Sequence, residues 1–372
     1  MKHNFFKTAI VIAVFSNFSI GYAQKEYNNW LINKCTILNF DTSPATIICN
    51  KNDEINTGFT QKSIALSDDN GNIILYGYKG PSNFVVKNNE NKQIVSFECN
   101  NANVIGAKLP QNGYYIAAVS IKMEKHSGEL HIYKFDKYGK LEKEYLYDDA
   151  YYSFFIDFMR IENYIVLIAY RKGQIETYKL TQEDCSLWKT SEIELDSFLH
   201  LLIPSYAIVH SSDNRKIIAT TYGTAYILNF DKKSGKITIS DKFESNKFYS
   251  MTFSNTDKYF LIIDDDKLKG FRYDKNFDFN LDNPEIIYDL PKTNEFVCNQ
   301  CWTMAIGIDN KLYIHEQGSD HIIVLNGIES ENITEEIISS ECVIKTNFPQ
   351  IIRNYVQDCK TSILSKPQII VE

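Results

Sequence analysis

The sequence lacks the features of helical, multidomain or membrane-spanning chains. Helical patterns are limited to short candidate turns at 195–202 and 335–339, and no Pro-, Gly- or Ser-rich linker, charge block or low-complexity stretch divides the 372 residues. Beyond the N-terminal 23 residues, no run approaches the roughly 18 consecutive apolar residues that a membrane span needs. We therefore expect no transmembrane segment and a single domain, because repeat folds of this length commonly form one domain.

The first 23 residues form a segment of different character. Lys2 and Lys7 precede an apolar run from Thr8 to Ile20, and small residues follow at Gly21 and Ala23. This pattern predicts a secretory signal peptide at 1–23, cleaved after Ala23, with an N-terminal anchor helix as the alternative. No cysteine follows the small residues directly, so a lipid anchor has no support. The domain at 24–372 is expected to be exported, to the periplasm, the cell surface or the medium.

Charge and cysteine content restrict the partners and the cross-links. Removing 1–23 takes away two lysines and no acid, so the formal charge falls from -8 to -10. Such a field repels nucleic acid, and we expect no nucleic-acid partner. Eight cysteines follow the signal, and an even number in an exported chain favours disulfides whose pairing the sequence leaves open. They are Cys35, Cys49, Cys99, Cys185, Cys298, Cys301, Cys342 and Cys359.

What is abundant is a repeated unit of turn and strand. The stretch 208–237 opens with a polar turn, alternates apolar and polar residues through two strands and turns again at Asp231–Gly235. Period-two alternation between turn residues is typical of antiparallel β-structure. Related units contain the turn residues Asp69, Asn112, Asn163, Asp213, Asp257 and Asp309, which are 43 to 52 residues apart. This spacing matches propeller blades.

The six units leave both ends of the chain unassigned. Joined in one sheet, Asn29 to Ile48 and Cys342 to Tyr355 would make a seventh blade and close the ring, which removes free sheet edges. The sequence therefore predicts an all-β fold, a single seven-bladed β-propeller whose N- and C-terminal strands share a blade. A six-bladed ring with decorated ends is the alternative.

Several short stretches resemble a known group of propellers. They are Asn28–Trp30 with Leu38–Phe40, the hairpin Leu66–Tyr76, the strand Ile308–Ile314 and the segment Asn347–Ile352. On these residues the mature chain resembles secreted propellers of gliding, type IX-secreting bacteria and related gut species, similar in fold to WD-repeat and YVTN propellers. The resemblance implies no assigned activity. Leu31, Ile32 and Asn33 replace the glycines usual after the opening Trp, and no Trp-Asp dipeptide occurs. We expect no surface anchoring through a C-terminal sorting module.

Two stretches have partial metal or redox spacing. His315-Glu316 and His321 resemble a zinc protease motif, but the histidines are six residues apart instead of four, and strands flank them. Cys298 and Cys301 have the spacing of a redox pair, but no βαβ unit surrounds them, so a structural disulfide is favoured. We predict no metal site and no cofactor.

Three further groups have a structural and a functional interpretation. Asp68–Asn72 and Asp264–Asp266 offer oxygen ligands for calcium, although turn or loop chemistry explains both. Aromatic residues gather from Tyr145 to Phe158, where they either stack on sugar rings or pack between blades. The aromatics in question are Tyr145, Tyr147, Tyr151, Tyr152, Phe154, Phe155 and Phe158.

No nucleophile elbow, phosphate-binding glycine loop or dinucleotide fingerprint occurs, so we name no catalytic residue, and the binding residues are left unassigned. We expect an exported, monomeric, non-catalytic β-propeller that binds or scaffolds a protein or glycan. The alternative is a glycan hydrolase or lyase whose acid and base come from different blades, which would leave no local trace in the sequence. A periplasmic assembly or sensing component differs from the first hypothesis only in its partner.

Overall fold

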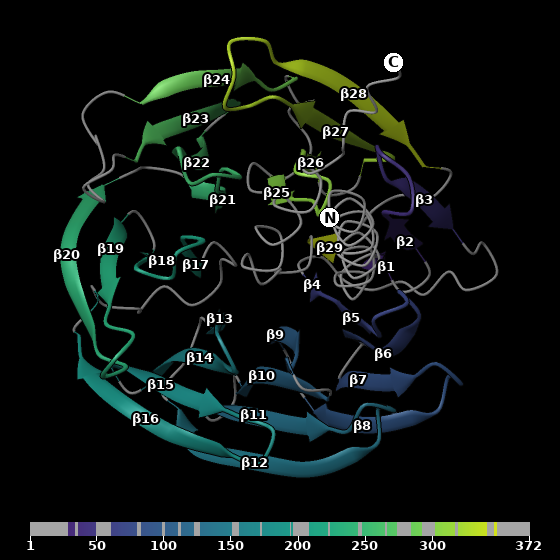
Figure 1. The fold of residues 1–372 in the computed structure, drawn as a ribbon, viewed down its shortest axis with the longest axis vertical. Coiled ribbons are helices and arrows are strands. Elements are labelled where there is room, and N and C mark those ends of the chain that lie inside the picture. The colour runs from purple at the N-terminus through teal and green to yellow at the C-terminus, as the bar shows by residue number, and fades with distance from the viewer. Residues whose placement is uncertain are drawn as a thin grey trace, which may run out of the picture.

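A computed structural model shows the architecture (Figure 1). It describes residues 29–33, 36–49, 61–79, 83–98, 101–110, 113–122, 127–150, 156–171, 173–193, 195, 208–221, 224–244, 248–264, 266–273, 284–291, 302–316, 319–340 and 346–347. These residues form strands, turns and bends and contain no helix. The candidate helical turn at 335–339 is therefore wrong, since these residues belong to a strand. The one at 195–202 lies outside the described residues, apart from Leu195.

The strands form seven antiparallel sheets, which we call blades 1 to 7 in chain order. Blade 1 has three strands: β1 (Asn29–Asn33), β2 (Thr36–Asn39) and β3 (Thr46–Cys49). Blade 2 comprises β5 (Ile64–Ser67), β6 (Ile73–Lys79), β7 (Asn83–Asn88) and β8 (Gln93–Glu98). Blade 3 comprises β9 (Asn101–Lys108), β10 (Tyr114–Lys122), β11 (Ser127–Phe135) and β12 (Leu141–Ala150).

The remaining blades repeat the four-stranded plan. Blade 4 comprises β13 (Ile156–Ile161), β14 (Tyr164–Arg171), β15 (Gln174–Leu180) and β16 (Cys185–Glu192). Blade 5 comprises β17 (Ile208–His210), β18 (Lys216–Thr221), β19 (Thr224–Phe230) and β20 (Ile237–Glu244). Blade 6 comprises β21 (Phe248–Phe253), β22 (Tyr259–Asp264), β23 (Lys267–Arg272) and β24 (Glu285–Asp289). Blade 7 comprises β25 (Trp302–Ile306), β26 (Leu312–Glu316), β27 (His321–Asn326) and β28 (Thr334–Ser339).

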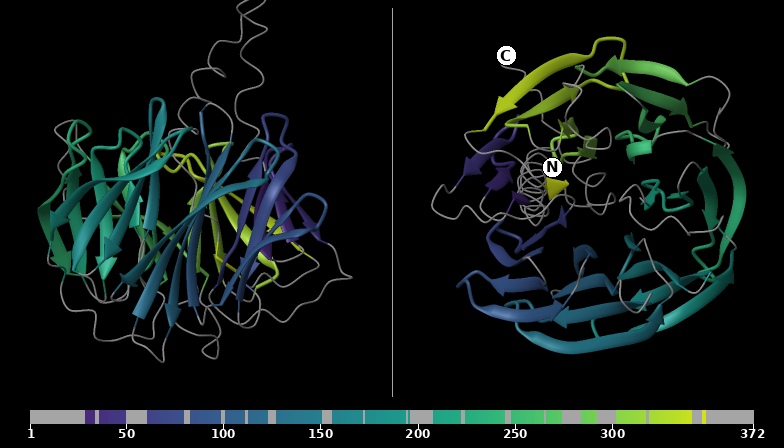
Figure 2. Two further views of the ribbon diagram at one scale, coloured as in Figure 1. Left: turned by 90° about the horizontal axis from the view of Figure 1, so that it is seen from below. Right: turned by 180° about the vertical axis from the view of Figure 1, so that it is seen from behind.

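The blades stand around a central axis as a short ring (Figures 1 and 2). The first strand of each blade lies innermost and the last lies on the rim, and successive first strands from β1 through β25 lie beside one another. This arrangement confirms the predicted all-β, seven-bladed propeller. It also gives the ring two faces. We call the face where the innermost strands begin the entry face, and the opposite one the turn face.

Repeated turn chemistry explains why the strands reverse on the turn face. In blades 5, 6 and 7 the third residue after Ser211, Ser254 and Gly307 donates its N–H to the carbonyl of that residue. These third residues have left-handed backbones: Asn214 (φ 56°), Asp257 (φ 58°) and Asn310 (φ 66°). Asn and Asp tolerate this conformation better than other side chains. Two of the predicted turn residues, Asp213 and Asp309, therefore lie one position before the residue with the left-handed backbone.

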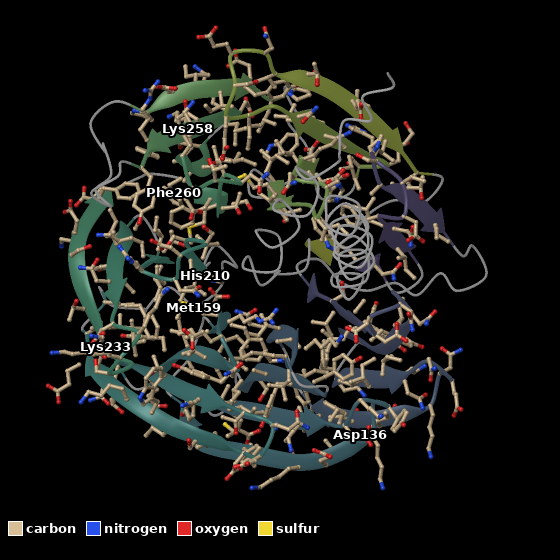
Figure 3. The ribbon with its side chains drawn as sticks, viewed as in Figure 1. Asp136, Met159, His210, Lys233, Lys258 and Phe260 are labelled. Atoms are coloured by element: carbon tan, nitrogen blue, oxygen red, sulfur yellow. The ribbon has the colours of Figure 1, made fainter. Side chains whose placement is uncertain are left out.

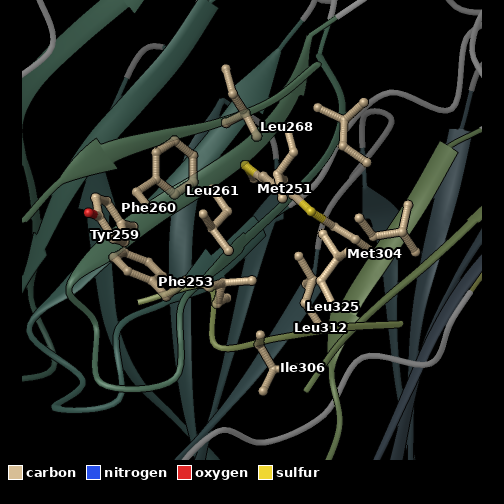
Figure 4. Close-up of a cluster of buried hydrophobic side chains, with 14 of the residues drawn as sticks. Met251, Phe253, Tyr259, Phe260, Leu261, Leu268, Met304, Ile306, Leu312 and Leu325 are labelled. Carbon is tan, nitrogen blue, oxygen red and sulfur yellow. The ribbon is translucent and has the colours of Figure 1, made fainter. Parts of the chain in front are cut away.

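The hydrophobic core lies between neighbouring blades. The largest cluster fills the space from blade 5 to blade 7 and includes Met251, Phe260 and Met304 (Figure 4). Similar clusters join blades 2 and 3, blades 3 and 4, and blades 4 and 5. Each sheet buries both faces only because a neighbour covers it, so the alternating strands of one unit require the next unit to fold.

Ring closure differs in detail from the shared sheet that we predicted. Trp30 and Phe40 of blade 1 pack against Tyr313, Ile322 and Val324 of blade 7 and join the two ends of the ring. The C-terminal strand β29 (Thr346–Asn347) pairs in parallel with β4 (Gln61–Lys62), which leads into β5, and lies beside β1 inside the ring (Figure 1). Among the described residues, β29 therefore forms a separate two-stranded sheet with β4, just before blade 2, and does not join the sheet of blade 1.

Candidate functional site

The innermost strands carry one buried pair of titratable residues. His210, at the end of β17, places Nδ1 2.7 Å from Oδ2 of Asp157 in β13, and both side chains are 2% exposed. The pair therefore links blades 4 and 5, and Figure 3 shows His210 beside Met159 at this joint. Two such polar side chains can be buried because the hydrogen bond between them offsets the cost of removing both from water.

The Asp157–His210 pair has the geometry that orients an imidazole for proton transfer. A general base also needs its second nitrogen within hydrogen-bond reach of the group that it deprotonates. His210 Nε2 is buried and has no hydrogen-bond partner among the described residues. With no hydroxyl, thiol or open cleft at this nitrogen, the described residues support a joint between two blades rather than a catalytic dyad.

Other polar groups near the axis also join blades. The Nδ2 of Asn29 donates to the carbonyl of Gly71 at 2.8 Å and links blades 1 and 2. The hydroxyl of Ser250 accepts the N–H of Met304 at 3.0 Å and links blades 6 and 7. Asp257 accepts the N–H of Ser212 at 2.8 Å between blades 5 and 6. Side chains committed to such bonds hold the ring together and are not available for a ligand.

The histidines of the weak zinc pattern have separate partners. His315 is fully buried, and its Nδ1 lies 3.2 Å from the hydroxyl of Ser319 and 3.3 Å from the carbonyl oxygen of His321. The ring of His321 instead faces Asp320, with Nδ1 3.2 Å from Oδ1. Within the described ranges, no group of three or more His, Cys, Asp or Glu side chains is arranged to hold a metal ion.

Two stretches singled out in the sequence meet at the joint of blades 6 and 7: the calcium candidate Asp264–Asp266 and the weak zinc pattern that contains Glu316 and His321. Burial raises the pKa of Glu316 at the end of β26; the charge of His321 opposes this shift and that of Asp266 reinforces it. On the same side, Lys269 Nζ lies 2.5 Å from Oδ2 of Asp264. Because β26 ends and β23 begins there, this partly buried acidic group lies on the entry face. Because its pKa is raised, the Glu316 carboxyl group holds its proton more tightly than an ordinary glutamate does.

The other calcium candidate is a turn. One carboxylate oxygen of Asp68 accepts the N–H groups of Asn70 and Asn72, both at 2.9 Å, and the other accepts the side-chain amide of Asn72 at 3.1 Å. The neighbouring Asp69 pairs with Lys108 of β9. Both carboxylates are therefore used within the fold, as the turn interpretation of the Asp-Asn-Gly stretch expects.

The described aromatic residues pack between blades. Tyr147 of β12 contacts Tyr178 of blade 4 with ring centroids 5.1 Å apart, and the hydroxyl of Tyr145 accepts the N–H of Cys185 at 3.1 Å. Phe158 lies in the same interblade cluster. These contacts support the packing interpretation for Tyr145, Tyr147 and Phe158. The other aromatics named above, at positions 151, 152, 154 and 155, lie outside the described residues.

Cys185 corrects part of the disulfide prediction. It is buried in the cluster between blades 3 and 4 and forms no disulfide, and burial raises the pKa of its thiol to about 12. A thiol enclosed by the core behaves as a small apolar side chain. Seven cysteines remain, an odd number, so at least one more is left without an intrachain partner. Cys298 and Cys301 lie outside the described residues, as do Cys35, Cys99, Cys342, Cys359 and the side chain of Cys49.

The sequence carried only weak signals for the joints near the axis. Asp157 stands in the apolar run Ile156–Ile161, and His210 ends the run Ile208–His210. A titratable residue among mostly apolar strand neighbours is a candidate for a buried partner. The two residues are 53 positions apart, however, and pair only because consecutive innermost strands become neighbours in the ring.

The rim carries exposed aliphatic side chains. The outermost described strand has such a residue, at least 43% exposed, in six of the seven blades, and the exception is blade 2. These residues are Ile48, Leu146, Leu187, Ile239, Ile286 and Ile337. Among the described residues, Tyr138 is the only aromatic of comparable exposure. Water-exposed aliphatic groups at related positions suit contact with another protein better than stacking on sugar rings.

Comparison with known proteins gives the fold and no family. No protein-family model matches the chain, and no curated protein matches its sequence. A protein from Lactobacillus plantarum has a similar structure, with a TM-score of 0.56 and 10% identity over 87% of this chain and 98% of that one. A periplasmic gluconolactonase from Pseudomonas aeruginosa has a TM-score of 0.53 and 9% identity over 87% and 97%. At these identities the likeness shows a shared propeller fold alone.

Proposed function

We propose that this chain is an exported, non-catalytic β-propeller that binds a protein through its rim. The observation that carries the proposal is the set of exposed aliphatic side chains on the outermost strands. The polar groups near the axis support it, because Asp157, His210, Asn29 and Ser250 are bonded across blade joints. Fold alone does not decide function, so the argument depends on these side chains.

The proposal includes export and the related group. The N-terminal pattern at 1–23 supports export, and no helix in the described part of the chain is long and apolar enough to cross a membrane. The short stretches around Trp30 and Leu66–Tyr76 support a place among the secreted propellers that the sequence resembles. Mass spectrometry of the exported protein tests the first point, with a mature N-terminus at Gln24 as the expected result.

Site-specific cross-linking tests protein binding. A photoreactive amino acid is placed at Leu187, Ile239 or Ile337 on the rim, and at Lys233 in an exposed turn as the matched control (Figure 3 shows Lys233). We expect the rim positions to give one discrete protein adduct in the producing cells and Lys233 to give none. Specific retention on a glycan array, together with rim positions that form no protein adduct, would support a glycan-binding module instead.

The enzyme alternative is favoured by one observation. Glu316 is a partly buried carboxyl group with a raised pKa and with Asp266 as a near neighbour, which is the environment of a general acid. If the chain hydrolyses or cleaves a glycan in this way, Glu316→Gln abolishes turnover in a screen of polysaccharide substrates while binding persists. Absence of turnover by the wild-type chain across that screen would count against this alternative.

A further inference from the structure

The rim strands of five blades carry an irregularity that blades 1 and 7 lack. In blades 2 to 6 the pairing between the third and fourth strands skips one residue of the outer strand, which is a β-bulge. The skipped residues are Ile94, Glu142, Trp188, Ser240 and Ile287. In blade 7, β27 and β28 pair without interruption from His321↔Ser339 to Asn326↔Thr334.

Bulges protect exposed sheet edges. A strand at the edge of a sheet presents unpaired N–H and C=O groups in a regular row, and another strand can add to that row. A bulge twists the edge and breaks its regular spacing, which disfavours the added strand. In blade 4 the bulge also turns Trp188 toward Phe230 of blade 5, with ring centroids 6.2 Å apart. Five rims are therefore unsuited to strand addition. Regular edges remain at β3 and β28, and β28 is the longer, with six residues against four.

The outer edge of β28 is open in the described part of the chain. The sheet of blade 7 ends at β28, and no other described strand hydrogen-bonds with it. Ile337 at its centre is 59% exposed, the largest fraction among the aliphatic rim residues. The neighbouring β3 of blade 1 lies against β28 (Figure 1) and contributes Ile48, which is 54% exposed. The edge thus combines a regular backbone with exposed aliphatic surface.

The two charged side chains of β28 point to the faces of its sheet and not along its outer edge. Glu335 accepts a hydrogen bond from the hydroxyl of Tyr288 at 2.7 Å on the side of blade 6. Glu336 lies 3.2 Å from Lys311 Nζ on the opposite side. Neither carboxylate blocks the edge. They also make β28 acidic, with no lysine or arginine among its six residues. A strand that pairs with β28 gains electrostatically from a lysine opposite Glu335, because opposite charges across strands stabilise a pair.

We propose that the outer edge of β28 receives an extended strand of a basic protein partner, with a lysine opposite Glu335 and an aliphatic residue opposite Ile337. The backbone bonds of the added strand supply affinity, and its alternating side chains supply specificity. This inference rests on the proposed protein-binding function and assigns it to one blade.

A synthetic strand tests the proposal on the full exported chain. The probe is a capped peptide of about ten residues that repeats Lys-Lys-Val-Val, so that a lysine opposite Glu335 leaves a valine opposite Ile337, and it is longer than β28 itself. Binding is followed by fluorescence anisotropy and by hydrogen exchange with mass spectrometry. We expect amide exchange to slow at 334–339, and at no other rim strand. A copy of the peptide in which every backbone amide is N-methylated should fail to bind, since neither of its edges can donate hydrogen bonds.

Matched variants separate an edge site from general attraction to an acidic protein. Ile337→Lys places a like charge beside the lysines of the probe and should weaken binding by about tenfold or more, since like charges at an interface are costly. Leu187→Lys makes the same change at a residue that is 51% exposed on the bulged strand β16 and should leave affinity unchanged. Both side chains are on the surface, so thermal unfolding should match that of the wild type.

Three results would overturn the inference. They are unchanged exchange at 334–339 with bound peptide, equal weakening by Ile337→Lys and Leu187→Lys, and equal binding of a glutamate–valine peptide. Each would remove β28 as the docking edge. The proposed function fails separately, when the rim cross-linking positions capture no protein.

Discussion

Ring closure depends on one tyrosine whose removal has a calculable cost. Tyr313 of β26 lies between Trp30 and Phe40 of blade 1, with ring centroids 5.6 and 5.2 Å away. Its hydroxyl donates to Oδ2 of Asp309 at 2.8 Å and accepts the N–H of Ala45 at 3.1 Å. The substitution Tyr313→Phe keeps the ring contacts and deletes both hydrogen bonds, of which the one with Ala45 crosses the joint between blades 1 and 7.

The two lost bonds differ in cost. Asp309 keeps a hydrogen bond from the hydroxyl of Ser43 at 3.2 Å, so losing the tyrosine costs this carboxylate about 1 kcal/mol. Ala45 is 1% exposed, and its amide is left without its acceptor, which costs about 1–3 kcal/mol. We therefore expect Tyr313→Phe to lower the free energy of unfolding by about 2–4 kcal/mol, a large share of the stability of an ordinary domain.

Urea unfolding at pH 7 measures this loss, with tryptophan fluorescence as the signal because Trp30 contacts the altered ring. Tyr138→Phe is the control: the same atom is removed from a side chain that is 73% exposed, and its effect should stay within about 0.5 kcal/mol. If Tyr313→Phe is as stable as Tyr138→Phe, the joint is not held by this hydroxyl, and the account of ring closure is wrong.

Three further predictions concern other joints. His210→Ala removes the imidazole that is hydrogen-bonded to the buried Asp157 and should destabilise the chain by about 3–5 kcal/mol in urea, while adding Asp157→Ala should cost less than the sum of the two changes. Gly235→Ala places a methyl group 2.6 Å from Trp188 and should lower the melting temperature more than Gly173→Ala, where a methyl meets nothing within 4 Å although both backbones are left-handed. Burial raises the pKa of several tyrosines above the ordinary value near 10, and of four of them most strongly, so the folded chain keeps protons that the unfolded chain loses. The stability that they confer is complete below about pH 10 and should fall as the pH rises above it, as urea titrations from pH 8 to 11 would show. The four are Tyr115, Tyr133, Tyr273 and Tyr313.

Local patterns in the sequence were sufficient to predict the blades. The alternation around Ile217–Thr220 and the Asp-Asn-Gly turn before Ile73 each describe a hairpin that forms among near neighbours. Gly71 has the expected positive φ of 87°. Because such hairpins cannot bury both faces alone, the six units together with the two unassigned chain ends favoured a ring of seven over a ring of six.

Contacts between distant residues could not be predicted in the same way. The pairing of β29 with β4 is parallel and joins residues 285 positions apart, so no local turn pattern in the sequence indicates it. The partners of Asp157 and Tyr313 likewise depend on which blades become neighbours. Cys185 shows a related limit, because counting cysteines takes no account of which thiols the core encloses. Nor could the sequence show that Glu316 and Asp266 lie near each other.

The joint between Trp30 and Tyr313 also constrains the order of assembly during synthesis. Trp30 of the first blade leaves the ribosome 283 residues before Tyr313, which must cover it, while the intervening hairpins can fold beside their neighbours as they emerge. Until blade 7 arrives, the nascent chain is an open arc whose two terminal sheets expose apolar faces. Partly formed proteins with such surfaces aggregate readily. Truncation within the last blade should therefore harm solubility more than its length suggests, because it leaves the arc permanently open.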